Sequence, residues 1–130
     1  MVEAIVRGAA KASLFAVTNP ECVRKLHWAR FPDTKPTGSD DATLAKWDER
    51  LLRAQLESIQ NAFDMNGGKL WGRATPDALG RMQDFMLESK LIDRKVAPAT
   101  LVIANEGFFE RVNNFDSQAV VKQAQACSVR

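Results

Sequence analysis

Trp71 and Arg73 are the residues of this sequence best suited to binding a small molecule. They follow a double glycine and flank Gly72, so they are expected on a loop. An aromatic ring beside an arginine on a loop suits the recognition of a small anionic or planar molecule. The alternative is that Trp71 staples the loop to the core, and the sequence favours that arrangement. Trp71 and Arg73 are thus the candidate ligand-binding residues, for a ligand that the sequence does not specify.

The other residue types that could do chemistry are poorly placed for it. His27 is the only histidine, and no cluster near it has metal-ligand spacing, so a structural role is favoured. The segment Gly67-Gly68-Lys69 lacks the earlier glycine and the following Ser/Thr of a phosphate-binding loop, and a helix stop explains its glycines. The paired carboxylates are expected at helix caps or on solvated faces. We expect no catalytic residue, no metal site and no cofactor, and a protein that is not an enzyme.

The two cysteines leave the redox state open. Cys22 and Cys127 are compatible with one disulfide or with none, and two partly buried free thiols are favoured. The sequence begins Met1-Val2-Glu3, without a basic segment followed by an apolar stretch, so no signal peptide is recognised. Either the protein is cytosolic or an export signal lies upstream.

Size and composition predict a single helical domain over residues 1–130. The chain has a mass of 14.4 kDa and is 45% hydrophobic and 26% charged, which is typical of a globular protein. Its net charge of +2 is spread along the chain, so no nucleic-acid partner is indicated. No stretch has the length and apolarity of a membrane span.

Apolar periodicity, proline and glycine divide the chain into helices that would position these side chains. We expect a mainly α fold of four to five helices, with at most one short strand at residues 101–103. The expected helices cover residues 3–17, 18–30, 40–65, 75–91 and 117–125, with a helical turn within 105–114.

Individual residues are expected to cap or bury these helices. Thr18 and Glu21 have the spacing of a capping box for the second helix. Trp47 lies on the apolar stripe of the long third helix and is expected in the core. The remaining residues expected on buried faces are Leu44, Leu51, Leu52, Leu56, Ile59 and Phe63 of that helix, and Leu79, Met82, Phe85, Met86 and Leu91 of the next.

Several stretches, in order and over nearly the whole chain, resemble the C-terminal part of a bacterial solute-binding protein. The family serves ABC importers of nitrate, sulfonates, taurine and the thiamine pyrimidine precursor. The residues that carry the likeness are Arg7-Gly8-Ala9-Ala10-Lys11-Ala12, Ala16-Val17-Thr18-Asn19-Pro20-Glu21, Lys35-Pro36-Thr37-Gly38, Trp71-Gly72, Thr75-Pro76-Asp77, Met82-Gln83-Asp84-Phe85-Met86, Leu91-Ile92, Asn105-Glu106, Phe108-Phe109 and Val112-Asn113-Asn114-Phe115-Asp116.

This resemblance implies two α/β lobes with a ligand cleft, a periplasmic location, a small anionic or heterocyclic solute and an ABC permease as partner. The family's chain is more than twice as long, and the part without a counterpart here is N-terminal. This chain would thus be the helical C-terminal portion of the fold. The resemblance transfers no ligand-binding residue. It also has a departure, because Lys90 stands before Leu91-Ile92 where relatives often have glycine.

Two other functions stay open. One is a free-standing helical interaction or oligomerisation module without ligand binding. The other is an enzyme related to those that make the thiamine pyrimidine, which would need a site rich in histidine or cysteine. Helices that have lost a sheet retain apolar faces, so we expect this chain to form a homodimer or a swapped assembly.

Overall fold

The computed structural model describes residues 1–102 and 105–127, and the regular structure of this part is entirely helical. The mainly α prediction is confirmed, with one helix more than expected, because part of the 105–114 segment forms a helix of its own. The elements are α1 (Val2–Thr18), α2 (Pro20–Arg30), the 3₁₀ turn η1 (Pro32–Thr34), α3 (Asp41–Asp64), α4 (Pro76–Glu88), the 3₁₀ turn η2 (Pro98–Leu101), α5 (Phe108–Asn113) and α6 (Ser117–Ala126).

The short strand allowed for at residues 101–103 does not form at residues 101 and 102, which the structure describes. Leu101 ends η2 and Val102 follows in an extended conformation, without a strand partner among the described residues. Ile103 lies outside the described residues. No helix in this part of the chain is long and apolar enough to cross a bilayer.

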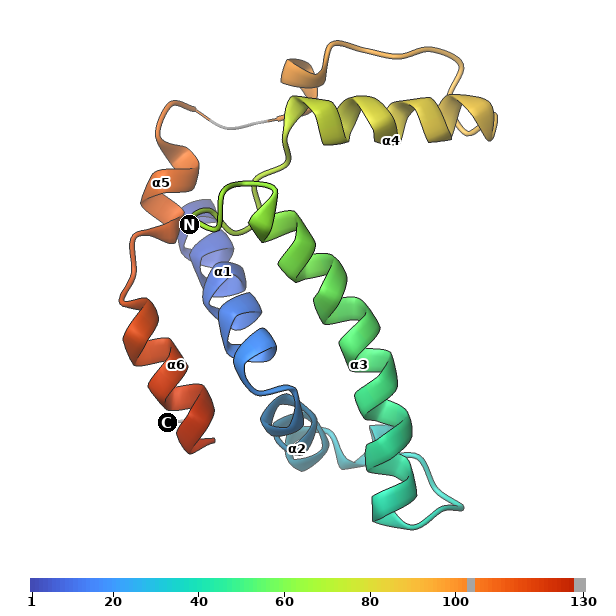
Figure 1. The fold of residues 1–130 in the computed structure, drawn as a ribbon, viewed down its shortest axis with the longest axis vertical. Helices are drawn as coiled ribbons and strands as arrows, with labels where there is room; N and C mark the ends of the chain where they lie inside the picture. Colours follow the sequence, from blue (N-terminus) through green and yellow to red (C-terminus); the bar gives the residue numbers. More distant parts are fainter. Residues whose placement is uncertain (103–104, 128–130) are drawn as a thin grey trace.

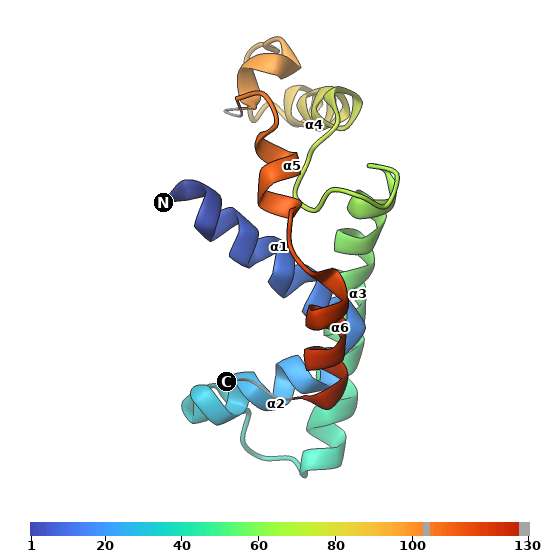
Figure 2. The same ribbon diagram turned by 90° about the vertical axis from the view of Figure 1, so that its left-hand side faces the viewer.

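Helix α1 is the centre of the packing. It contacts α6, α5, α2 and α3, and the two ribbon views show it lying among them (Figures 1 and 2). Alanines recur along α1, and their small side chains allow neighbouring helices to approach closely. The core that results is small, and its buried apolar residues are Ala10, Cys22, Leu44, Trp71, Val112, Val120 and Ala124.

The second helix begins one residue later than the capping-box spacing indicates. Asn19 is its N-cap, and the Asn19 side-chain oxygen accepts the Cys22 N–H at 3.0 Å. Pro20 takes the first helical position, where its missing N–H costs nothing, so the residue before it becomes the cap. The Thr18 hydroxyl instead donates to the Leu14 carbonyl at 2.7 Å. Glu21 pairs with Lys25 at 2.8 Å, and the hydrogen bond and charge of that lysine lower the pKa of Glu21.

The long helix α3 has the ends that the sequence predicts. Asp40 caps its start by accepting the Thr43 N–H at 2.9 Å, and the Thr43 hydroxyl also donates to this carboxylate. These two hydrogen bonds hold the pKa of Asp40 below its usual value. At the other end, Gly67 and Gly68 both have positive φ angles, 71° and 68°, which only glycine adopts freely. The double glycine is thus the helix stop expected from the sequence.

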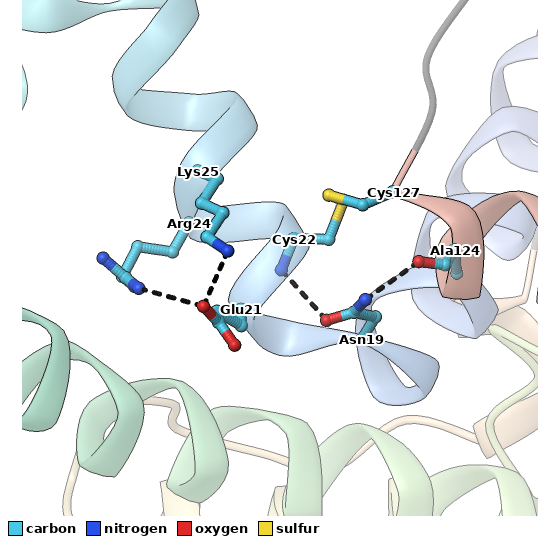
Figure 3. A network of polar contacts seen from close by, with 7 residues as sticks. All are labelled: Asn19, Glu21, Cys22, Arg24, Lys25, Ala124 and Cys127. Atoms are coloured by element: carbon cyan, nitrogen blue, oxygen red, sulfur yellow. Dashed lines mark hydrogen bonds and ion pairs between the residues drawn. A yellow bond between two sulfur atoms is a disulfide. The ribbon is translucent and has the colours of Figure 1, made fainter.

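The two cysteines form a disulfide, so the expectation of free thiols is wrong. Cys22 at the start of α2 and Cys127 after α6 have Cα atoms 5.5 Å apart, within the range that a disulfide spans. Asn19 links the same two elements, because its side-chain N–H₂ donates to the Ala124 carbonyl at 2.9 Å (Figure 3). Nothing in the sequence indicated this proximity, because the two cysteines are 105 positions apart.

Several residues expected in the core are exposed. On α3, Trp47, Leu51 and Ile59 are 59%, 62% and 38% exposed, whereas Leu44 is buried and Leu52, Leu56 and Phe63 are half-buried. On α4, Met82, Phe85 and Leu91 are exposed, whereas Leu79 and Met86 are half-buried. The physical reason is that each helix packs along one narrow line. In the described part of the chain, α4 packs mainly against η2 (Figure 1).

Candidate functional site

Trp71 lies in the core rather than on an open loop. Its side chain is 6% exposed and its ring stacks on Phe63 of α3, with ring centroids 4.0 Å apart and planes inclined by 16°. Its backbone is clamped by Asn113 of α5, whose side chain accepts the Trp71 N–H at 2.8 Å and donates to the Trp71 carbonyl at 3.1 Å. Trp71 therefore holds the loop after α3 against both α3 and α5.

Arg73 differs from Trp71 in being exposed. Gly72 between them has a φ of +80°, and the chain turns there. Trp71 before the turn is buried, whereas Arg73 after it is exposed. The Arg73 carbonyl accepts a hydrogen bond of 2.6 Å from the Asn66 side chain, which fixes the backbone while the guanidinium remains in solvent. Asn66 was not singled out by the sequence, where it read only as part of the helix stop.

Trp71 and Arg73 line one cavity, of about 350 Å³. Its walls come from α1, the end of α3, the loop and the start of α4, where Thr75 caps the helix by accepting the Ala78 N–H at 3.1 Å. Cavities that hold small ligands range from about 300 to 1,000 Å³. An apolar wall with one arginine and the positive end of a helix suits a small anion that carries an apolar body. The apolar side is completed by Ile59, Ala62, Phe63 and Met65, and Ser13 of α1 lies beside them.

A larger apolar groove lies between α1, α2 and α6, and sequence reasoning missed it. Its volume is about 740 Å³, and Phe15, Val23, Leu26 and Val120 contribute to its floor. It depends on contacts between residues far apart in the chain, because the disulfide and Asn19 bring α6 to the start of α2. No local sequence signal could have indicated it.

The remaining candidates for chemistry have structural roles. The His27 ring nitrogen Nε2 lies 3.0 Å from the Thr34 hydroxyl, and the ring contacts Phe31 at a centroid distance of 5.4 Å. Within residues 1–102 and 105–127, no three side chains of the types that bind metals come together. Asp40 caps α3, and Asp41 pairs with Lys35 at 2.7 Å. The carboxylates thus lie at caps and on solvated faces, as the sequence predicts.

The turn that ends α4 contains a lysine with a left-handed backbone conformation. Lys90 has a φ of +55°, in the left-handed region that favours glycine. The Leu91 N–H donates to the Met86 carbonyl at 2.8 Å and the Lys90 N–H to the Leu87 carbonyl at 3.0 Å. This double hydrogen bond is the Schellman arrangement, in which the left-handed residue is most often glycine. The chain therefore keeps the backbone of a glycine helix end while carrying a lysine.

Replacing Lys90 by glycine is expected to stabilise the protein. Glycine removes the contact between Cβ and the backbone in the left-handed conformation, which costs about 1 kcal/mol. The more flexible unfolded chain offsets part of this gain. Urea unfolding followed by far-UV circular dichroism measures the change. Ser89→Gly is the matched control, because Ser89 has a negative φ of −79° and no strain to relieve. A lower free energy of unfolding in Lys90→Gly than in the wild type would contradict this prediction.

Comparison of the chain with protein-family models, curated protein sequences and solved structures finds no match.

Proposed function

We propose that this chain is part of the solute-binding component of an ABC importer and that the solute is a small anionic or heterocyclic nutrient. The observation that carries the proposal is the apolar surface that the helices leave uncovered. The total accessible surface of the chain is 9562 Å², whereas a folded monomer of this mass exposes about 6,800 Å², and many large apolar side chains are among the exposed residues. Helices that cover a sheet in a larger α/β lobe have such a surplus when the sheet is absent.

The face of α4 supports this interpretation most directly. Met82 and Phe85 of α4 are 46% and 64% exposed, and Val96 and Leu101 of the segment after α4 are 44% and 43% exposed. The connector is nevertheless held firmly, because the buried Gln83 amide donates to the Val96 carbonyl at 3.1 Å and accepts the Val96 N–H at 2.8 Å. An ordered apolar layer of this kind is suited to packing against the remainder of a lobe.

Two further features support the proposal. The Cys22–Cys127 disulfide is suited to an oxidising compartment such as the bacterial periplasm, where solute-binding proteins work. The left-handed conformation of Lys90 is compatible with the family pattern, since the position keeps the backbone that glycine favours, although the lysine side chain remains a difference. The ordered likeness of the sequence segments completes the argument.

Thermal unfolding with a panel of solutes tests the proposal. The panel contains alkyl sulfonates, nitrate, bicarbonate, aromatic carboxylates and pyrimidines. A solute at a hundredfold excess over its Kd adds about 2.7 kcal/mol of stability. For a chain of this size we expect the Tm to rise by roughly 8 °C, saturably and with one solute class only. Arg73→Gln should abolish the rise if the Trp71–Arg73 cavity holds the anion, and Arg94→Gln is the matched control on the exposed connector.

A cooperative transition that no solute shifts would contradict ligand binding by this chain. It would favour the second candidate, a free-standing helical interaction module. The same surplus of exposed surface favours that candidate, because it also offers area for a protein partner.

A further inference from the structure

The long helix α3 carries a second line of residues that the fold leaves in solvent. Trp47, Leu51, Ala54 and Ser58 are all exposed, and they are spaced by four, three and four residues. Both ribbon views place α3 along one edge of the molecule (Figures 1 and 2). Another side of the same helix carries the half-buried Leu52, Leu56 and Phe63, so α3 is apolar on two sides.

Alternate spacings of three and four residues form the seam of a coiled coil. A helix that only covers its own domain needs one apolar stripe, and α3 already has one toward α1 and α2. A second helix placed on the outer stripe would remove the Trp47 and Leu51 side chains from water. We call Trp47, Leu51, Ala54 and Ser58 the outer seam.

The outer seam complements itself when two copies of α3 run antiparallel. The helix spans Asp41–Asp64, and alignment of the two 24-residue helices end to end places Trp47 opposite Ser58 of the second copy. The same alignment places Leu51 opposite Ala54 of the second copy. Each large side chain therefore meets a small one, in the way that closely packed helices interdigitate. A twofold axis repeats both contacts, as in a symmetric dimer.

The charges beside the outer seam fit the same arrangement. Arg50 and Glu57 lie on one flank of the seam, two helical turns apart, and neither forms an ion pair with another described residue. In an antiparallel pair each flank faces the same flank of the other helix. In the end-to-end alignment Arg50 lies level with Gln55 of the second copy. Glu57 of the second copy lies on the facing flank, two residues or about 3 Å further along the axis, within reach of the long Arg50 side chain, and the symmetry produces this pair twice. A parallel pair would not bring these two charges together.

We propose that the outer seam of α3 is a dimerisation surface on which a second copy of this chain docks antiparallel. A stable interface buries about 800 Å² per partner, and the whole chain exposes about 2,800 Å² more than a compact monomer, so the chain has surface to bury in a dimer. Most of the surplus is left for other partners, including the face of α4. The dimer therefore goes beyond the proposed function and does not depend on it.

Sedimentation equilibrium of the full chain, with charge reversals in α3, tests the dimer. We expect a concentration-dependent dimer in the wild type. Arg50→Glu and Glu57→Arg should each raise the dimer Kd about tenfold, because each turns two attractive pairs into repulsive ones. The double variant Arg50→Glu/Glu57→Arg should return to within about threefold of the wild-type Kd, since both pairs are restored with exchanged signs. Leu51→Glu should leave only monomer.

The control is Arg94→Glu, which makes the same charge change on the connector after α4 and should leave the Kd unchanged. Circular dichroism verifies that each variant keeps its helices. Three results would overturn the proposal: a monomer at all concentrations up to about 100 μM, an association that Arg50→Glu and Leu51→Glu leave unaltered, or a double reversal no tighter than the single ones. Association through α4 would give the second of these results.

Discussion

Reduction of the Cys22–Cys127 disulfide is expected to lower the free energy of unfolding by about 4 kcal/mol. The bond closes a loop of 105 residues, and in the loop-entropy account a bridge across about 100 residues stabilises the folded state by roughly 4.7 kcal/mol. Burial adds to the stabilisation by the disulfide, because Cys22 is 1% exposed and its bond to Cys127 holds α6 against the core. Urea unfolding with and without a reductant, followed by circular dichroism, measures the difference.

The double variant Cys22→Ala/Cys127→Ser is the control for this measurement. It should unfold at the urea concentration of the reduced wild type and should not respond to the reductant. An unfolding midpoint that is the same in reduced and oxidised wild-type protein would contradict the stabilising role of the bond. The Asn19 hydrogen bonds to Cys22 and Ala124 remain possible after reduction, so the helices should still form near their native positions at low urea.

Truncation of Trp71 to alanine is expected to cost about 3–4 kcal/mol, as for other buried aromatic residues. The change removes the stacking on Phe63 and empties space beside α5, where the backbone of the loop is held by Asn113. The matched control is Trp47→Ala. Its side chain is 59% exposed, so its loss should change the free energy of unfolding by less than about 0.5 kcal/mol.

Urea unfolding of the two variants, at a low protein concentration that keeps the chain monomeric, distinguishes the two sites. Tryptophan fluorescence gives an independent readout, since Trp71→Ala should remove the blue-shifted emission of the buried ring. Equal losses of stability in the two variants would show that Trp47, too, is buried in solution.

Local signals predicted the helices well, because the residues that begin and end them act within a few positions. Asp40 and Thr75 cap α3 and α4, and the double glycine ends α3, each through contacts close in sequence. Pro20 also marks the start of α2, although it assigns the cap to Asn19 rather than to Thr18. These interactions need no knowledge of the tertiary fold.

The faces of the helices could not be predicted in the same way. Periodicity identified α3 as amphipathic but did not separate two apolar stripes, so the exposed Trp47 and the half-buried Leu56 were placed on one side. The disulfide joins residues 105 apart, and Asn113 reaches Trp71 across a separation of 42. Such contacts depend on how the helices pack. For the candidate site, the sequence identified the exposed Arg73 and the loop, whereas the burial of Trp71 arises from Phe63 and Asn113.

The bond between Cys22 and Cys127 also changes the covalent topology of the molecule. The backbone from α2 to the end of α6 forms a closed ring, from which α1 extends as a tail. A protease that cuts once in the turn between η1 and α3 would therefore open the ring without releasing a fragment. The two pieces would migrate as one species on a denaturing gel until a reductant separates them. A chain closed in this way tolerates a single cut with its parts still tethered.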